Sequence, residues 1–257
     1  MIPDNLRLLD VGGTFIKCSH GRSVPVDSNG SREEIVAAFR EAVGEARELR
    51  VAIPGPFDYG RGIFLMKHKF AAVYGEYFAD LVGIPRERCR FVHDVVAMLL
   101  GSVPSGGGNA ALVTLGTGLG FCMWIDGRPL VNELGSPAVS IYNRPYRDGV
   151  LEDYASKRAV VGAYGDPSLT VKEIASRAFA GEGKAREVFA RMGGTIGEGI
   201  ASILEEYGVK QLLLGGQISR SWELFAPSLA EKLPAGITVG PVADFDNATF
   251  NGLAGLD

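Results

Sequence analysis

Cysteine and histidine are scarce in this chain of 257 residues. The three cysteines are far apart and form no CxxC pair, and the three histidines do not cluster with them: Cys18, Cys89 and Cys122; His20, His68 and His93. A disulfide framework and a structural zinc site both need clustered residues of these types, so we expect neither. We interpret the cysteines as small core residues in a reducing compartment.

Long hydrophobic runs and an excess of positive charge are also missing. No apolar run approaches the roughly 20 residues that span a bilayer. The first residues, MIPDNLRLLD, lack the basic and apolar segments of a signal peptide. Lys and Arg together number 26 against 30 Asp and Glu, for a net charge of −4, and no basic patch stands out. These features predict a cytoplasmic protein without membrane or nucleic-acid partners.

Glycine, in contrast, is abundant, with 35 residues of 257, about twice the usual share of about 7%. Many of these glycines form short clusters directly after apolar runs. Three clusters stand out: Gly12-Gly13, Gly116-Thr117-Gly118 and Gly215-Gly216. Glycine at such places lets a backbone approach a ligand closely, so we interpret the clusters as parts of a binding site.

Hydrophobic patterning predicts an α/β protein, in which strands and helices alternate. Two segments match the capping-box pattern that begins a helix, SREE from Ser31 and TVKE from Thr170. The predicted strands are 6–11, 15–19, 23–26, 51–53, 90–93, 110–115, 121–125, 129–131, 211–214 and 238–241. The predicted helices are 32–48, 74–82, 95–100, 171–180, 184–207, 221–232 and 248–256.

The segment VPSGGGN, residues 103–109, is the best candidate for a linker. The segments LDVGGTF and TLGTGLGF, one on each side of it, share the order apolar strand, glycine-rich turn, apolar strand. A duplicated α/β unit explains this likeness. We therefore predict an N-terminal α/β domain, residues 1–108, and a C-terminal α/β domain, residues 109–257, whose terminal helix packs back on the first domain.

The glycine turns allow two interpretations. Asp10 followed by Gly12-Gly13-Thr14 suits an ordinary β-hairpin turn, because Asp and Gly are common turn residues. The other interpretation is a phosphate loop, in which backbone N–H groups close around phosphate oxygens. The chain has no GxxxxGK[ST] motif, and GTGLG lacks the GxGxxG spacing, so the common nucleotide-binding templates do not decide between them.

Seven motifs, in order, resemble the ROK family of sugar kinases: DVGGTFIK, PGPFDYGRG, HDVVAMLLG, VTLGTGLGF, NELG, LEDYASKRA and LLLGGQIS. The resemblance covers nearly the whole chain. The resemblance implies an actin-like (ribonuclease H-like) two-domain ATPase fold with a central cleft, of the superfamily that includes hexokinase and Hsp70. It also implies ATP-dependent phosphorylation of a hexose or hexose derivative, Mg²⁺ as a cofactor, and a homodimer.

The resemblance further implies which residues bind the nucleotide. Asp10 would order the magnesium ion through water. The first phosphate loop would contain Gly12, Gly13 and Thr14, with Lys17 beside it. The second phosphate loop would contain Gly116, Thr117, Gly118 and Gly120. Gly215 and Gly216 would border the adenosine.

Asp94 matches the catalytic base of the family. Its place between a strand and a helix suits that role, because a carboxylate there could accept the proton of a sugar hydroxyl. The alternative is an N-cap aspartate without a catalytic role. Glu133 in NELG and Glu152 in LEDYAS match two carboxylates that bind hexose in the family, although exposed loop glutamates are common. His93 stands where the family commonly has Asn, and we expect it to make one sugar contact.

Two departures from the family pattern matter. The family often has Glu-x-Gly-His followed by a cysteine-rich zinc loop, whereas this chain has Glu133-Leu134-Gly135-Ser136 and then NRPYRDGV without cysteine. We therefore predict no zinc, and a loop held by other contacts, such as those of Tyr142, Tyr146 or Arg147. The missing histidine also removes one sugar contact, so the sequence does not identify the sugar.

Two further readings stay open at this point. The family includes transcriptional repressors with an N-terminal helix-turn-helix module, and here the first phosphate motif begins near residue 10, so a regulator would act through protein contacts instead. A third reading keeps the fold and changes the acceptor, or replaces ATP by polyphosphate as the donor.

Overall fold

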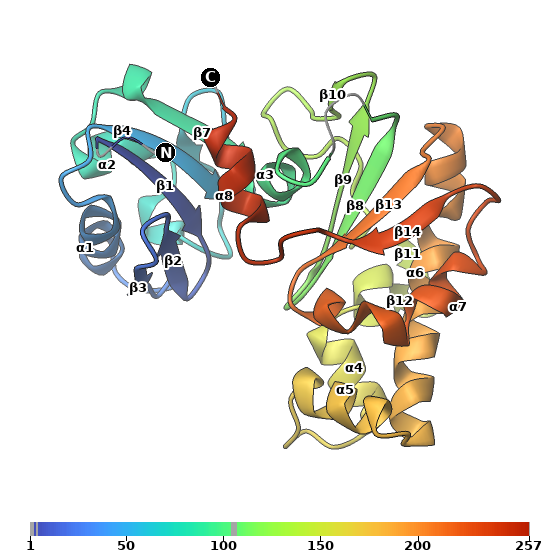
Figure 1. Ribbon diagram of the computed structural model, residues 1–257. Coiled ribbons are helices and arrows are strands. Elements are labelled where there is room, and N and C mark those ends of the chain that lie inside the picture. Colours follow the sequence, from blue (N-terminus) through green and yellow to red (C-terminus); the bar gives the residue numbers. More distant parts are fainter. Residues whose placement is uncertain (1–2, 4, 104–106, 257) are drawn as a thin grey trace. The chain divides into compact units, whose positions relative to one another are not determined.

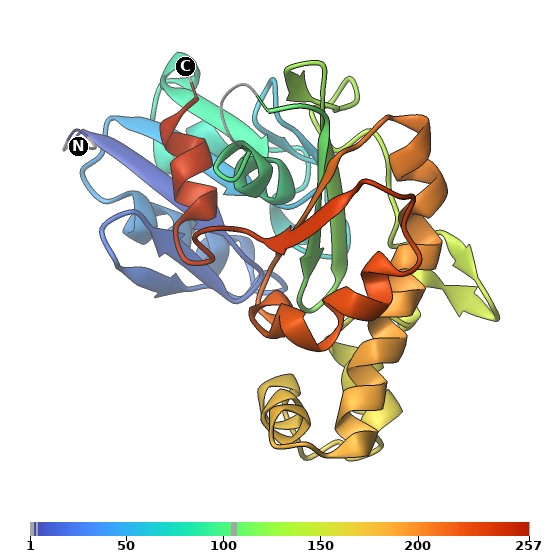
Figure 2. The same cartoon turned by 45° about the vertical axis from the view of Figure 1, so that its right-hand side comes forward.

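The computed structural model describes residue 3, residues 5–103 and residues 107–256. The chain forms two compact units (Figures 1 and 2). Unit 1 contains the described residues up to Ser102 together with Val131–Ala138 and the described residues from Asp246 onward, and unit 2 contains the rest. The units therefore interleave along the chain, whereas the sequence predicts one boundary after residue 108. Part of the predicted linker, residues 104–106, lies outside the described residues.

Unit 1 is built on a sheet of five strands in the order β3-β2-β1-β4-β7. The first three strands are antiparallel and the last three are parallel, with Asp10 opposite Lys17 on β2 and opposite Ala52 on β4. The strands are β1 (Leu6–Val11), β2 (Phe15–Cys18), β3 (Ser23–Pro25), β4 (Glu48–Ile53) and β7 (Cys89–His93).

Unit 2 repeats this sheet order as β10-β9-β8-β13-β14, again with antiparallel pairing on one side of the first strand, β8, and parallel pairing on the other. The strands are β8 (Ala110–Leu115), β9 (Leu119–Ile125), β10 (Arg128–Pro129), β13 (Gln211–Gly215) and β14 (Thr238–Pro241). The turn Asp126-Gly127 joins β9 to β10, and both residues have positive φ, 51° and 80°. The shared order of the two sheets agrees with a duplicated α/β unit.

The helices of unit 1 are α1 (Arg32–Val43), α2 (Phe78–Val82), α3 (Asp94–Leu100) and α8 (Ala248–Ala254), with short strands β5 (Phe57–Asp58) and β6 (Ile63–Phe64). The capping box of α1 is confirmed, since Ser31 accepts from the Glu34 amide and Glu34 accepts from the Ser31 amide. The predicted end of this helix at residue 48 is wrong. Gly44 has φ 59° and ends α1, and Glu48 already begins β4.

The core between α1 and the sheet of unit 1 is aromatic. Phe39 of α1 is fully buried, and its ring lies 4.7 to 5.7 Å, centroid to centroid, from the rings of Phe64, Phe70 and Phe78. Leu9 and Val11 of β1 belong to this cluster, whereas Leu8, directly before Leu9, is fully buried outside it. Alternation along the strand therefore buries both faces of the sheet.

The second face of this sheet is covered by α3 and α8, which lie side by side although they are about 150 positions apart in sequence (Figure 1). Two glycines allow this contact. A Cβ added at Gly252 would lie 1.9 Å from the Ala97 carbonyl oxygen, and one added at Gly101 would lie 1.9 Å from the Ala248 carbonyl oxygen. The C-terminal helix thus belongs to the packing of unit 1.

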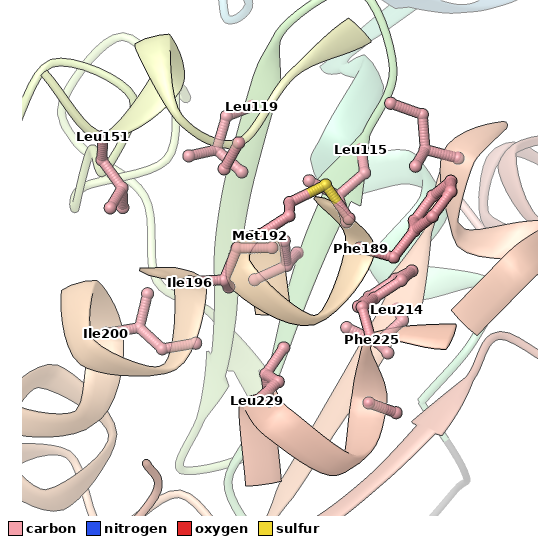
Figure 3. Packing of buried hydrophobic residues seen from close by; sticks show 14 of the residues in the cluster. Leu115, Leu119, Leu151, Phe189, Met192, Ile196, Ile200, Leu214, Phe225 and Leu229 are labelled. Atoms are coloured by element: carbon pink, nitrogen blue, oxygen red, sulfur yellow. The ribbon is translucent and has the colours of Figure 1, made fainter. Parts of the chain in front are cut away.

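The helices of unit 2 are α4 (Lys157–Tyr164), α5 (Val171–Phe179), α6 (Gly183–Glu206) and α7 (Ala226–Ala230). Helix α6 runs along one face of the sheet (Figure 2). Its Phe189, Met192 and Ile196 pack with Leu115, Leu214 and Phe225 (Figure 3). Residues 221–232, predicted as one helix, instead form a 3-10 segment, Ile218–Leu224, and the short α7. Phe225, whose φ is −130°, lies between the two, and Pro227 follows near the start of α7.

A small hairpin of unit 2 was not predicted as strands. It consists of β11 (Pro145–Tyr146) and β12 (Gly149–Val150), within the segment NRPYRDGV. The guanidinium of Arg147 lies 5.2 Å from the Tyr146 ring and 5.6 Å from the Tyr154 ring, within cation–π range. The Tyr146 hydroxyl donates to Glu198 of α6 at 2.7 Å. Tyr146 and Arg147, two of the three residues expected to hold this loop, therefore do so.

Among the described helices, none combines the length and the apolar character that a bilayer crossing needs.

We predict that Gly252→Ala destabilises the protein by about 3 kcal/mol, because the added methyl group must separate α3 from α8. Gly255→Ala is the matched control, since its Cβ would meet its nearest neighbour at 3.7 Å and its φ is −87°. We expect the control to change the free energy of unfolding by less than about 0.5 kcal/mol. Urea unfolding midpoints measure both variants. Equal midpoints would contradict the close approach of the two helices.

Candidate active site

The first glycine turn, Gly12-Gly13-Thr14, joins β1 to β2. Its carbonyl oxygens are used by the segment after β3: Gly13 accepts from the Ser28 amide at 3.2 Å, and Thr14 accepts from the Val26 amide at 2.9 Å. The Gly12 amide donates to the Phe15 carbonyl at 2.9 Å. Within the described part of the chain, the amides of Gly13 and Thr14 have no acceptor. The turn therefore presents two unpaired N–H groups, which suits an anion.

Asp10 lies at the end of β1, directly before this turn. Its carboxylate is 3.4 Å from the Lys17 ammonium, and its side chain keeps 21% of its exposure. Burial raises the pKa of the Asp10 carboxyl, Lys17 opposes the rise, and the charge of Asp94 adds to it, so the pKa is raised overall. A bound cation would relieve the cost of ionising Asp10.

Asp94 is the first residue of α3, and His93 is its N-cap residue, so the N-cap alternative for Asp94 is wrong. The Val95 amide lies 2.8 Å from Oδ1 of Asp94 and 3.2 Å from Nδ1 of His93. The shorter distance favours Asp94 as its acceptor, which leaves the protonated Nδ1 of His93 to donate to the same oxygen at 2.8 Å. His93 thereby orients the carboxylate.

These contacts leave one oxygen of Asp94 available. Every hydrogen bond to the Asp94 side chain from the described residues goes to Oδ1, and 38% of the side chain is exposed. Burial raises the pKa of Asp94, but the hydrogen bond and charge of His93, the Val95 amide and the charge of Lys69 lower it by more. The pKa is therefore below its usual value, and the carboxylate is ionised at neutral pH.

Glu133 belongs to a loop, Val131–Ala138, that docks on unit 1 through Tyr59. The Tyr59 amide donates to the Leu134 carbonyl at 2.9 Å, and a Cβ at Gly135 would lie 2.9 Å from the Tyr59 Cβ. Asn132 closes the loop, because its Oδ1 accepts from the amides of Leu134 and Ser136. The exposed Glu133 is therefore held in the same unit as Asp10 and Asp94.

Tyr59 connects this loop to the end of β7. Its hydroxyl donates to the Ile53 carbonyl at 2.9 Å, and its ring lies 5.8 Å from the His93 ring. Burial, with the charge of Asp94, raises the pKa of Tyr59 far above its usual value, so the hydroxyl stays protonated. Tyr59 lies within the motif PGPFDYGRG, but sequence reasoning did not single it out, because its role depends on contacts with residues distant in the chain.

The second glycine turn, residues 116–118 of unit 2, closes on itself through a bond of 3.1 Å from the Gly116 amide to the Gly118 carbonyl. The amides of Thr117 and Gly118 have no acceptor among the described residues. The Leu119 amide donates to Oε2 of Glu152 at 2.8 Å, and the Lys157 amide of α4 donates to the Gly116 carbonyl at 2.9 Å. Both predicted phosphate loops thus share unpaired amides at their tips.

Glu152 was predicted to bind sugar. In the structure one of its oxygens anchors the second glycine turn, so Glu152 has a structural contact in unit 2 whether or not it also contacts a sugar. A Cβ at Gly118 would lie 2.7 Å from this oxygen. Gly120 lies within β9, beyond the tip of the turn.

Gly215 ends β13 and Gly216 follows it in a turn, as the sequence predicts for a strand followed by a glycine turn. Gly216 has φ 82°, and a Cβ there would lie 2.4 Å from the Leu115 carbonyl oxygen, so only glycine fits. The buried Ser219 donates to the Gly215 carbonyl at 2.6 Å. This turn directs the next residues, Gln217 and Ile218, into a cavity.

The cavity belongs to unit 2 and has a volume of about 740 Å³. One side contains the second glycine turn and the start of α4, and the other sides come from α5 and the 3-10 segment 218–224. Three cations line it, Lys157, Lys172 and Arg220. Apolar residues also line it, including Ala175, Ile218 and the half-exposed Phe179. An apolar bed beside cations and unpaired amides can bind a flat ring joined to phosphates.

Sequence reasoning missed most of this lining. Lys157 lies within the motif LEDYASKRA, so its place in a site had a signal in the sequence. Lys172 and Phe179 follow the Thr170 capping box on α5, where an exposed lysine and a core phenylalanine are the ordinary interpretation. Among the described residues, no three His, Cys, Asp or Glu side chains are close enough together to hold a metal ion.

Comparison with known proteins identifies the family. The model of the ROK family matches residues 33–245. A ROK family protein from Streptococcus pneumoniae, solved with sucrose, is 18% identical with a TM-score of 0.78, covering 96% of each chain. A ROK family glucokinase from Streptomyces griseus, solved with glucose and AMPPNP, is 21% identical with a TM-score of 0.75, also covering 96% of each chain.

A ROK family transcriptional regulator, homologous to the E. coli MLC protein, is 18% identical with a TM-score of 0.74, covering 98% of this chain and 77% of the regulator. No curated protein sequence matches the chain. The predicted actin-like α/β fold is confirmed by these structures. The chain belongs to the ROK family and has the fold of its sugar kinases.

Proposed function

We propose that this protein is an ATP-dependent sugar kinase that transfers the γ-phosphoryl group to a hydroxyl of a hexose or hexose derivative. The observation that carries the proposal is the state of Asp94, an ionised carboxylate with one oxygen fixed by two donors and the other available. A general base needs this combination of orientation and an open acceptor. The family and the fold agree with a sugar kinase, and family members also include regulators.

The donor would be bound by the two glycine turns and the cavity of unit 2. The adenosine would lie on Ala175, Ile218 and Phe179, with Gly215 and Gly216 bordering it. The phosphates would accept from the unpaired amides of the two turns. Lys157, Lys172 and Arg220 would offset part of the negative charge.

Asp10 would hold Mg²⁺ through water, with Lys17 beside it. The raised pKa of Asp10 supports this, because a carboxyl whose ionisation is costly is stabilised by a nearby cation. The metal would neutralise charge on the phosphates. The charge of Asp94 raises the pKa of Asp10 and both residues belong to unit 1, so the metal and the base would act at neighbouring points.

In the proposed reaction, the second oxygen of Asp94 accepts the proton of the sugar hydroxyl. The hydroxyl oxygen forms a bond to the γ-phosphorus, and the bond from that phosphorus to the β,γ-bridging oxygen breaks. ADP leaves with the electron pair. Because the pKa of Asp94 is low, we infer that it mainly orients the hydroxyl and receives the proton late, which suits the loose transition state of phosphoryl transfer.

The sugar would contact Glu133, Glu152 and His93. Carboxylates accept two hydroxyls with fixed geometry, which suits vicinal hydroxyls of a hexose. The Nδ1 of His93 is committed to Asp94, so only its Nε2 would contact the sugar. We further propose a primary hydroxyl as the acceptor, a zinc-free site, and a cytoplasmic homodimer.

A coupled assay of ADP release over a panel of hexoses, amino sugars and sugar acids tests the function. We expect one sugar class to stimulate ADP release strongly above the rate with ATP alone. A parallel panel with polyphosphate identifies the donor. Sugar binding without any sugar-stimulated release from either donor would contradict the kinase and support a regulator.

We predict that Asp94→Asn lowers kcat by about a hundred- to ten-thousandfold, the usual contribution of a general base. The amide keeps the contacts of the carboxylate but cannot accept a proton. Glu87→Gln, at an exposed carboxylate of the same unit, is the control and keeps full activity. AMPPNP binding by isothermal titration calorimetry checks that the nucleotide site survives. Native turnover in Asp94→Asn would exclude Asp94 as the base.

We predict that alanine at one glycine of unit 2 lowers the thermal stability, whereas alanine at another weakens nucleotide binding without changing the stability. Gly216→Ala should lower Tm by about 10 °C, because of its positive φ and the clash with Leu115. Gly116→Ala should change Tm by less than about 2 °C, since its Cβ meets no described atom within 4 Å. Gly116→Ala should also weaken AMPPNP binding, because we expect the phosphates to approach Gly116 on the side where the added Cβ would lie. Native affinity in Gly116→Ala would contradict the placement of the phosphates.

A further inference from the structure

Lys69 is held beside the first glycine turn by the residue that follows it. Phe70 is fully buried and has φ 52°, and its amide donates to the Ser28 carbonyl at 2.6 Å. The Ser28 amide in turn donates to the Gly13 carbonyl. Two hydrogen bonds and a buried ring therefore fix the backbone at Lys69 relative to Gly13.

The Lys69 side chain crosses the bare face of Gly13. A Cβ built on Gly13 would lie 3.9 Å from Cε and 4.0 Å from Cδ of Lys69. The far end of the chain is thus near the unpaired amides of Gly13 and Thr14. Its positive charge also acts on Asp94, lowering the pKa of that carboxyl.

The charge of Lys69 has no counter-ion within the part of the chain that the structure describes. Lys17 pairs with Asp10 at 3.4 Å, whereas Lys69 forms no ion pair with any described residue, and it is half-buried. A cation without a described counter-ion can pair with an anion that comes from elsewhere. Two unpaired amides beside it point to the same kind of ligand.

Lys67 lies two residues before Lys69, but its side chain has different surroundings. Its ammonium lies 5.3 Å from the centre of the Tyr74 ring, and the side chain is exposed. Lys67 and Lys69 therefore have the same charge and neighbouring places in the sequence, but only Lys69 contacts the glycine turn. Lys67 is a matched control.

We propose that Lys69 is a further phosphate-binding residue, whose ammonium contacts the terminal phosphoryl group of the donor at the first glycine turn. The inference rests on the proposed kinase function. The terminal phosphate fits better than an acidic group of the sugar, because the lysine stem lies against Gly13, whose amide is one of the phosphate donors. There the ammonium would offset charge on the group being transferred.

Isothermal titration calorimetry with AMPPNP and with ADP, both with Mg²⁺, tests this without turnover. Lys69→Met should weaken AMPPNP binding by about ten- to a hundredfold, the range of a charge-assisted hydrogen bond, and leave ADP binding within about twofold, because ADP lacks the terminal group. Lys67→Met should bind both nucleotides like the wild type. Lys69→Arg should recover part of the AMPPNP affinity, because it keeps the charge.

Thermal unfolding checks that the variants fold. Because Lys69 has no described counter-ion, we expect Lys69→Met to unfold no earlier than the wild type, and Lys69→Gln provides a second variant if it does. An equal loss for both nucleotides, or no loss for either, overturns the role of Lys69 and leaves the kinase proposal intact. A wild type that binds neither nucleotide overturns both.

Discussion

The two glycine turns share one constraint. The carbonyl oxygens of each turn accept hydrogen bonds from other segments of the same unit. In unit 1, the segment after β3 binds the carbonyls of Gly13 and Thr14, and in unit 2 the start of α4 binds the carbonyl of Gly116. A turn whose carbonyls are satisfied this way leaves its N–H groups facing outward together. The same physical solution occurs once in each copy of the repeated sheet.

Charged side chains surround the first turn. The charge of Asp94 raises the pKa of Asp10, the charge of Lys17 lowers it, and the charge of Lys69 lowers the pKa of Asp94 without forming an ion pair with it. The pKa of Asp10 is raised and that of Asp94 is lowered, because only Asp94 receives hydrogen bonds from His93 and the Val95 amide. Two similar carboxylates are thereby suited to different tasks, one to a cation and one to a proton.

The sequence predicts the parts of the site that depend on local patterns. Strands 6–11 and 238–241 have the predicted bounds, since short apolar runs between turn residues are strong signals. Asp94 and the glycine turns were found through their motifs. Lys69, Tyr59 and Phe179 were not, because their places depend on tertiary contacts such as the bond from Phe70 to Ser28, which no local pattern contains. The first helix ended early because a glycine with positive φ outweighed the apolar periodicity beyond it.

A crystal structure of the protein with AMPPNP and Mg²⁺ tests the central claim most directly. The account predicts phosphate oxygens within hydrogen-bond distance of the amides of Gly13 and Thr14 and of those of Thr117 and Gly118. Phosphates bound away from either pair of amides would contradict it.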